Sequence, residues 1–281
     1  MPEGNPTTGR TGPSSTAGPS PAAGPSPAAA GPAFPPDPLE VARLHAAREA
    51  VLARIAAACE RAGRDPAEVT LVAVSKTVPP ERLVAAVAAG LTVLGENRVQ
   101  EAAAKVPRVP GARWHLVGPL QSNKARRAVE LFEMIESVDS VELARRLDRI
   151  VRELRGLPAA GPVDPRQRLA ILVQVNVDLD PAKAGVLPGD LESALAAIAA
   201  CQALRLDGLM TIGRLADTPA QARATFRGLR ELAARMRLAV PPLGPALSMG
   251  MSDDYPIAVE EGATIVRVGR AIFGRRPDRA G

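Results

Sequence analysis

A primary amine stands at the end of an apolar run in "LVAVSKTVPP" (71–80), where Lys76 comes shortly before two prolines. Lysine is scarce in this chain: Lys76, Lys105, Lys124 and Lys183 are the only lysines among 35 lysines and arginines. A guanidinium stays protonated, whereas a desolvated amine loses its proton and attacks a carbonyl carbon. Lys76 is therefore a candidate for covalent chemistry with a carbonyl compound. The alternative is a strand-end cation whose amine reaches solvent.

Two segments late in the sequence are suited to an anion. "SMGMSDD" (248–254) and "VGRAIFG" (268–274) combine small residues and glycine with helix-forming sequence. Backbone N–H groups in such turns, together with the start of a helix, bind phosphate. A structural turn uses the same residue types, so the interpretation depends on where the fold places these segments relative to Lys76.

The elements that must position these residues alternate along the chain. An amphipathic helix is predicted from Pro38 until Gly63, and the clearest later helix covers about 140–155. Helical stretches separate apolar strand candidates at 70–75, 91–94, 112–118, 134–138, 168–177, 205–212, 245–249 and 264–269.

Strands that are each followed by helical sequence indicate a parallel sheet covered by helices. Closed on itself, this sheet is a single (β/α)8 TIM barrel; an open doubly wound sheet is the alternative. The barrel is favoured because the first strand ends in "SKTVPP" (75–80) and lacks the glycine-rich turn of a dinucleotide-binding sheet. Barrel sites lie at the C-terminal strand ends, and phosphates commonly bind after strands seven and eight. Lys76 and both anion-suited segments are thus expected on one rim.

Composition argues against several classes of function. The net charge of +5 comes from arginines spread among many acids, and one Trp, one Tyr and four Phe offer little stacking surface, so we expect no nucleic-acid binding. Two histidines and two isolated cysteines are too few for a zinc site, and such thiols are typical of reduced cytoplasmic proteins. No apolar run approaches the roughly 20 residues that span a bilayer, and the N-terminus lacks a signal-peptide pattern. We expect a cytoplasmic protein without metal or membrane association.

Two regions differ in composition. Residues 1–37 are rich in proline and glycine among serine, threonine and alanine. This composition buries too little apolar surface to offset the entropy of ordering. We expect a disordered tail at 1–37 and one barrel domain at 38–277.

Several blocks of the sequence resemble the YggS/PROSC family of pyridoxal phosphate homeostasis proteins, in family order over roughly residues 39 to 276. The blocks are "VAVSKT" (72–77), "GENRVQE" (95–101), "WHLVGPLQSNK" (114–124), "GLMTIG" (208–213), "LSMGMSDD" (247–254) and "VRVGRAIFGRR" (266–276). The resemblance implies a barrel similar to the N-terminal domain of alanine racemase. It also implies that pyridoxal 5'-phosphate (PLP) is held as a Schiff base on the strand-one lysine.

The resemblance assigns a role to each predicted site residue. Lys76 matches the Schiff-base lysine, Asn97 lies near the ring, and Arg267 matches the arginine that faces the pyridine nitrogen. The positions expected in the phosphate cup are Ser248, Gly250, Gly269 and Arg270. A guanidinium only donates hydrogen bonds, so it keeps that nitrogen unprotonated and mutes carbanion chemistry. A buried charge without a partner is costly, so we expect a ligand to partner Arg267 rather than an arginine lost in an apolar strand.

Two positions depart from the family pattern. Arg98 stands where the family commonly has tyrosine, which puts a phenol-dependent role there in doubt. Arg270 stands where the family commonly has threonine, which leaves the backbone N–H and a guanidinium as donors in place of a hydroxyl. His115 either packs beside the cofactor or is a satisfied core histidine.

The resemblance implies a non-catalytic protein that buffers and delivers PLP, with effects on amino-acid and keto-acid metabolism. Expected partners are PLP and PLP-dependent apoenzymes, and we expect a monomer. The alternative is a PLP-dependent amino-acid racemase, which requires acid/base groups on both faces of its substrate. Alanine racemase obtains the second group from a tyrosine of another domain. Here we expect no second domain, and the single tyrosine, Tyr255, follows strand seven, so the carrier is favoured.

Overall fold

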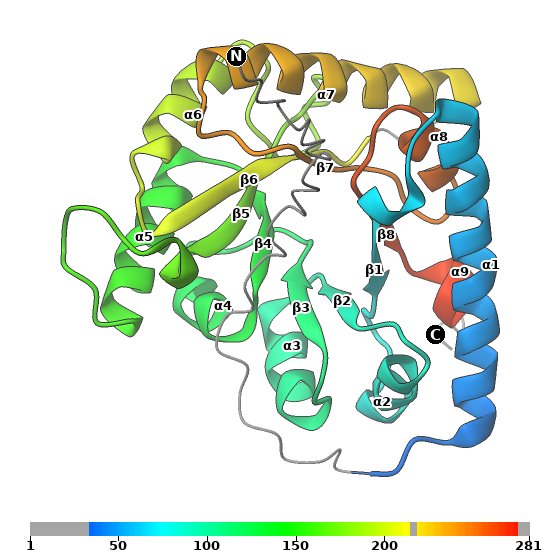
Figure 1. The fold of residues 1–281 in the computed structure, drawn as a ribbon. Helices are drawn as coiled ribbons and strands as arrows, with labels where there is room; N and C mark the ends of the chain where they lie inside the picture. The colour runs from blue at the N-terminus through cyan, green and yellow to red at the C-terminus, as the bar shows by residue number, and fades with distance from the viewer. Residues whose placement is uncertain (1–33, 214–217, 275–281) are drawn as a thin grey trace, which may run out of the picture.

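A computed structural model of the chain describes residues 34–213 and 218–274 (Figure 1). Its strands are parallel and close into a barrel in chain order, with the last strand paired to the first. The strands are β1 Thr70–Val74, β2 Val93–Glu96, β3 Arg113–Leu116, β4 Met134–Val138, β5 Leu169–Gln174, β6 Leu204–Met210, β7 Ala246–Ser248 and β8 Ile265–Val268. The predicted (β/α)8 barrel is confirmed, and the open sheet is wrong.

Helices alternate with the strands and cover the outside of the barrel (Figure 1). They are α1 Pro38–Ala62, α2 Pro80–Ala88, α3 Val99–Lys105, α4 Ala125–Leu131, α5 Val141–Leu154, α6 Leu191–Ala199, α7 Pro219–Ala239, α8 Tyr255–Glu260 and α9 Arg270–Phe273. Within residues 34–213 and 218–274, none of the helices has the length and apolar character needed to cross a membrane.

The leading helix α1 confirms the predicted amphipathic segment. The Asp37 carboxylate caps it by accepting from the N–H of Leu39 (3.0 Å), and Gly63 ends it with a φ of 64°, a conformation that glycine adopts without steric cost. The helix packs along the outer side of the barrel against α2, α8 and α9 (Figure 1). Residues 1–33 of the predicted tail, and the predicted end of the barrel at 275–277, lie outside the described residues.

Side chains alternate between the barrel interior and the layer beneath the helices. Val72 and Val74 of β1 belong to the interior cluster, whereas Ala73 belongs to the outer one. Continued past the end of β1, this alternation directs residue 76 inward. On β2, Val93 is an interior residue and Leu94 an outer one, so residue 97 falls on the inward side as well.

One strand boundary differs from the prediction. The second strand was expected at 91–94, but β2 covers Val93–Glu96. Leu91 instead belongs to the turn that ends α2, since its N–H donates to Ala86 O (2.9 Å) and Gly90 before it has a φ of 86°. The shift makes Asn97 the residue that directly follows β2.

Candidate functional site

Lys76 lies just beyond β1, in a turn at the C-terminal mouth of the barrel. The turn is closed by a hydrogen bond from Val78 N to Ser75 O (3.0 Å), and Lys76 is half-buried. Val74 at the end of β1 is in register with Gly95 of β2. The half-buried Asn97, two residues beyond Gly95, therefore emerges at the same rim as Lys76.

Asn97 is positioned by a glycine on the next strand connection. A Cβ atom on Gly118, which follows β3, would lie 2.4 Å from Asn97 O and 2.7 Å from Asn97 Cα. Only glycine leaves room for this close approach of two backbones. The sequence interpretation missed this role for Gly118, although the residue lies inside one of the family-like blocks.

The two anion-suited segments lie in contact with each other. The N–H of Gly269 donates to Ser252 Oγ (3.2 Å), which joins the loop after β7 to the start of α9. Gly269 also lies against β1, since a Cβ there would be 3.3 Å from Val74 O. The fold thus brings both segments to the rim that carries Lys76. Their role as a phosphate cup stays a prediction.

Gly250 allows the tight turn after β7. It has a φ of 89°, and a Cβ there would lie 2.5 Å from the Cβ of Ala258. Gly250 O accepts from Arg267 N (3.0 Å), and the Asp254 carboxylate accepts from Met251 N (2.6 Å). Burial raises the pKa of Asp254, although the bond from Met251 and the charge of Arg267 act in the opposite direction.

Arg270 presents its guanidinium to one of the two anion-suited segments, and its place in the predicted phosphate cup stays a prediction. It forms an ion pair with Asp253 in the loop after β7, and both side chains are exposed. Arg98, the other departure from the family pattern, is also exposed and lies 4.0 Å from Glu101. Neither side chain is part of the buried structure of the site.

A buried polar network crosses the barrel interior beneath the mouth. Glu136 of β4 is fully buried, and its carboxylate contacts His115 Nδ1 (2.7 Å) and accepts from Ser248 Oγ (2.6 Å). Arg267 Nη1 donates to the same Ser248 Oγ (2.6 Å), and Arg267 Nη2 donates to Thr211 O (2.8 Å). The network therefore connects β3, β4, β7 and β8 with the end of β6.

Opposite charges in this network stabilise the charged forms of Glu136 and Arg267 against the cost of burial. Burial raises the pKa of Glu136, but the hydrogen bond and charge of His115, with Arg267 and Ser248, outweigh it and hold that pKa below its ordinary value. Burial lowers the pKa of Arg267, while Glu136 and Asp254 act to raise it. We interpret Glu136 as a carboxylate that compensates the buried guanidinium of Arg267.

These contacts change the interpretation of three residues. Arg267 has protein partners, so the expected lack of a partner no longer argues for a ligand. The hydroxyl of Ser248 donates to Glu136 and accepts from Arg267, so its proton is already engaged within the barrel. His115 is a satisfied core histidine. The role of Arg267 toward a ring nitrogen stays a prediction.

Glu136 is a second residue whose role sequence reasoning missed. The signal was a lone glutamate in the buried strand "MIESV" (134–138), since an ionised carboxylate is almost never fully buried unless it is paired. Nothing in the sequence indicated which cation would pair with it.

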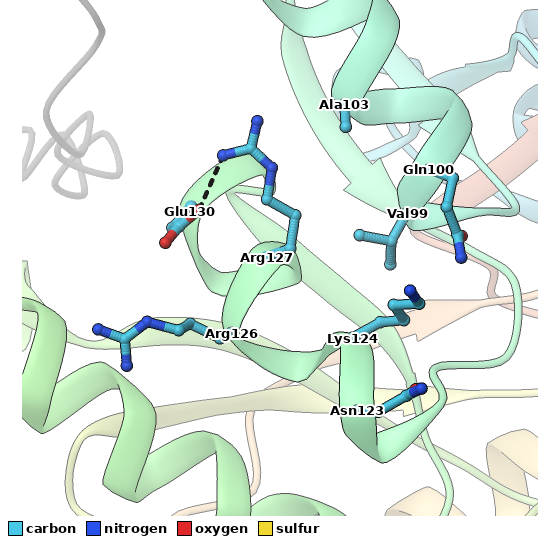
Figure 2. A pocket seen from close by; sticks show the side chains of 8 residues that line it. All are labelled: Val99, Gln100, Ala103, Asn123, Lys124, Arg126, Arg127 and Glu130. Atoms are coloured by element: carbon cyan, nitrogen blue, oxygen red, sulfur yellow. Dashed lines mark hydrogen bonds and ion pairs between the residues drawn. The ribbon is translucent and has the colours of Figure 1, made fainter.

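A separate groove of about 360 Å³ lies between α3 and α4 on the outer wall (Figure 2). Its lining residues are Val99, Gln100, Ala103, Asn123, Lys124, Arg126, Arg127 and Glu130. Arg127 is paired with Glu130 (2.8 Å), and Arg126 with Glu153 (2.9 Å). The groove shares no residue with the predicted site at the mouth.

Comparison with known proteins decides the family. The family described as alanine racemase, N-terminal domain, matches residues 47–277. The pyridoxal phosphate homeostasis protein of Pseudomonas aeruginosa is 42% identical over 228 residues, which cover 80% of this chain and 93% of that protein. This chain belongs to the family of pyridoxal phosphate homeostasis proteins. The resemblance seen in the sequence blocks is confirmed.

Solved structures of similar proteins agree with this family and fold. PipY of Synechococcus elongatus PCC7942, solved with PLP bound, is 43% identical to this chain and superposes with a TM-score of 0.67. The match covers 80% of this chain and 100% of PipY. Alanine racemase from Corynebacterium glutamicum is 17% identical with a TM-score of 0.59 over 86% of this chain and 63% of the racemase. The racemase shares the fold, whereas the homeostasis proteins also share the sequence along nearly their whole length.

Proposed function

We propose that this chain binds PLP at the barrel mouth through Lys76 and acts in PLP homeostasis. The observation that carries the proposal is an amine at the C-terminal end of β1, on the same rim as two touching glycine-containing loops, in a member of this family. The relative PipY is described with PLP bound. A carrier of this kind buffers a reactive aldehyde and passes it to PLP-dependent apoenzymes.

The residues at the mouth fit this cofactor in their chemistry. Lys76 would carry PLP covalently through its amine, and Asn97 would lie near the ring. Gly250 and Gly269 belong to the two loops that touch at the rim, and backbone N–H groups in such loops suit a phosphate. When bound, PLP supplies a reactive aldehyde and an electron-accepting ring.

Arg267 would limit how strongly that ring accepts electrons. Its guanidinium has only donors to offer, and it is oriented by Ser248 Oγ and Thr211 O. Glu136 lies behind Ser248 and balances the charge. A donor at the pyridine nitrogen opposes protonation of that nitrogen, which favours holding the cofactor over turning over an amino acid.

The position of the single tyrosine does not support the racemase alternative. Tyr255 is fully buried, and Arg54 of α1 lies 5.0 Å from the centre of its ring. This tyrosine packs between α8 and α1 on the outside of the barrel, and it is the single tyrosine of the sequence. We propose that the chain is a non-catalytic cytoplasmic carrier that acts as a monomer.

Absorbance spectroscopy of the purified protein tests the proposal. We expect added PLP to produce an adduct band in the wild type, which disappears in Lys76→Ala and persists in the matched lysine variant Lys124→Ala. A wild-type protein that takes up no PLP would refute the proposed function.

Incubation of the PLP-loaded protein with single L-amino acids tests the carrier role. The chirality of each amino acid and the exchange of its α-hydrogen for deuterium are followed over time. Turnover at an enzymatic rate would contradict the carrier role.

A further inference from the structure

The turn that carries Lys76 has an unusual backbone. Lys76 and Thr77 form its centre, between Ser75 O and the donating N–H of Val78. Thr77 has a φ of 64°, which in the third position of a turn is usual for glycine or asparagine. For a β-branched residue this value is an outlier, and it persists only where the surroundings hold it.

Side chains hold both peptide groups that flank the Cα of Lys76. Before it, Ser75 O accepts from the buried Lys105 Nζ (2.9 Å). After it, Lys76 O accepts from Thr77 Oγ1 (2.6 Å), and Thr77 N donates to Glu101 Oε2 (3.3 Å). The direction in which the Lys76 side chain leaves the backbone is therefore set from both sides.

Lys105 is itself held by a buried carboxylate. Glu96 of β2 is fully buried; its Oε1 lies 2.5 Å from Lys105 Nζ and accepts from Ser75 Oγ (2.7 Å). Glu101 Oε2 lies 3.8 Å from the same nitrogen. The ammonium of Lys105 is a compact charge whose donors are not confined to one plane, as those of a guanidinium are, so it can donate to Ser75 O and Glu96 while staying close to Glu101. This explains one of the few lysines in an arginine-rich chain.

We propose that Glu96, Lys105 and Glu101 form a clamp that fixes the direction in which Lys76 presents its amine. The inference rests on the proposed function, since it concerns how Lys76 meets the aldehyde of PLP. These are positioning residues: Glu96 shares the outward side of β2 with Leu94, beneath the helices, and acts through the backbone of β1. A displacement of about 1 Å in a reacting group can cost about 100-fold in reactivity.

The double variant Glu96→Leu with Lys105→Met tests the clamp. It removes both buried charges together, while Ser75 Oγ keeps Gly95 O as a partner (3.1 Å) and Ser75 O keeps the N–H of Val78. The probes are PLP and pyridoxine 5'-phosphate. The second compound has an alcohol in place of the aldehyde and cannot form a Schiff base with Lys76. We expect the Kd for PLP to rise about 10- to 100-fold and the Kd for pyridoxine 5'-phosphate to stay at the wild-type value.

The pair of ligands separates positioning of the amine from general damage to the mouth. Equal weakening of both ligands, or wild-type binding of both, would overturn the clamp. Lys124→Met, a lysine outside the clamp, is the control that should leave both Kd values unchanged. A wild type that forms no adduct with PLP would overturn the proposed function itself. Adduct formation by the wild type is therefore measured before any variant is made.

Glu101→Ala provides the test if the double variant does not fold. It removes the acceptor of the Thr77 N–H at a partly exposed position, with Glu96 and Lys105 left as a pair. We expect a smaller rise in the Kd for PLP, again without a change for pyridoxine 5'-phosphate. An unchanged Kd for PLP in this variant would contradict the clamp.

Discussion

Glu136 and Glu96 are both fully buried glutamates, yet they sit in different kinds of network. Glu136 faces the barrel interior, where its two oxygens contact His115 and Ser248, and Arg267 completes the set. Glu96 faces α3, where one oxygen serves Lys105 and Ser75. Its other oxygen has no hydrogen-bond partner among residues 34–213 and 218–274.

The difference teaches that the effect of losing a buried carboxylate depends on what remains. In the interior network, Glu136 contacts His115 and Ser248 directly, and its charge also acts on Arg267. In the outer set, Ser75 has an alternative acceptor, and Lys105 is the one buried cation. The interior network should therefore tolerate no simple neutral replacement, whereas the outer pair should.

The largest effect is expected for Glu136→Leu. The substitution removes one of the two carboxylates whose charge stabilises the buried guanidinium of Arg267, and it removes the ionic partner of His115 and an acceptor from Ser248. Breaking one side of a buried ion pair costs about 3–5 kcal/mol in free energy of unfolding. Urea denaturation measures the loss. Adding Arg267→Met should restore little of the lost stability, since His115 and Ser248 still lack Glu136 as a partner. Full recovery of the stability would contradict the interpretation that Glu136 holds these residues together as one network.

A smaller and reversible effect is expected at the outer pair. Lys105→Met alone leaves Glu96 buried without a cation and should cost about 3 kcal/mol in free energy of unfolding. Adding Glu96→Leu should restore most of this stability, because two apolar side chains of similar volume replace the pair. A double-mutant cycle by urea denaturation measures the coupling. If the second substitution adds to the loss, the contrast between the two networks is wrong.

The smallest effect is expected at Glu40, a partly exposed carboxylate that also has two cationic partners. A hydrogen bond from Arg43, against an opposing effect of burial and together with Arg82, lowers the pKa of Glu40 from 4.5 to about 2. Because the folded-state pKa is the lower one, this stabilisation is fully present above pH 4.5 and is lost as pH falls toward about 2.

Glu40→Gln should therefore reduce the fall in stability across this acidic window. Solvent screening limits the change to below about 1 kcal/mol. Denaturation of the wild type and the variant at the two ends of the window measures it. An identical pH dependence in both proteins would contradict the lowered pKa of Glu40.

Much of the candidate site could be predicted because a parallel barrel places the C-terminal ends of its strands on one rim. The apolar runs and the alternation of strand and helix are local properties of the sequence, and parallel closure then puts every C-terminal strand end on one rim. The rim position of Lys76 and of the two glycine-containing segments follows from this reasoning, whereas the individual roles of Asn97, Gly250 and Gly269 were assigned by resemblance to the family. The predicted start of β2 was wrong by two residues, because Leu91 belongs to the turn that ends α2.

The partners of the charged residues could not be predicted in the same way. The ion pair of Arg270 with Asp253 joins two different loops, and the sequence around Arg270 did not indicate it. Arg267 was expected to need a ligand because its own strand offers only apolar neighbours. Its partners come from β4, β6 and β7, and no local pattern encodes them.

By itself, the sequence determined the barrel, the rim and the amine on it, because periodicity and strand order depend on neighbouring residues. Only the tertiary structure decided how that amine is held. Lys105 reaches Ser75 O across 30 positions, and Ser248 reaches Glu136 across 112. Hydrogen bonds act over about 3 Å, so the groups that they join are known only once the chain has folded.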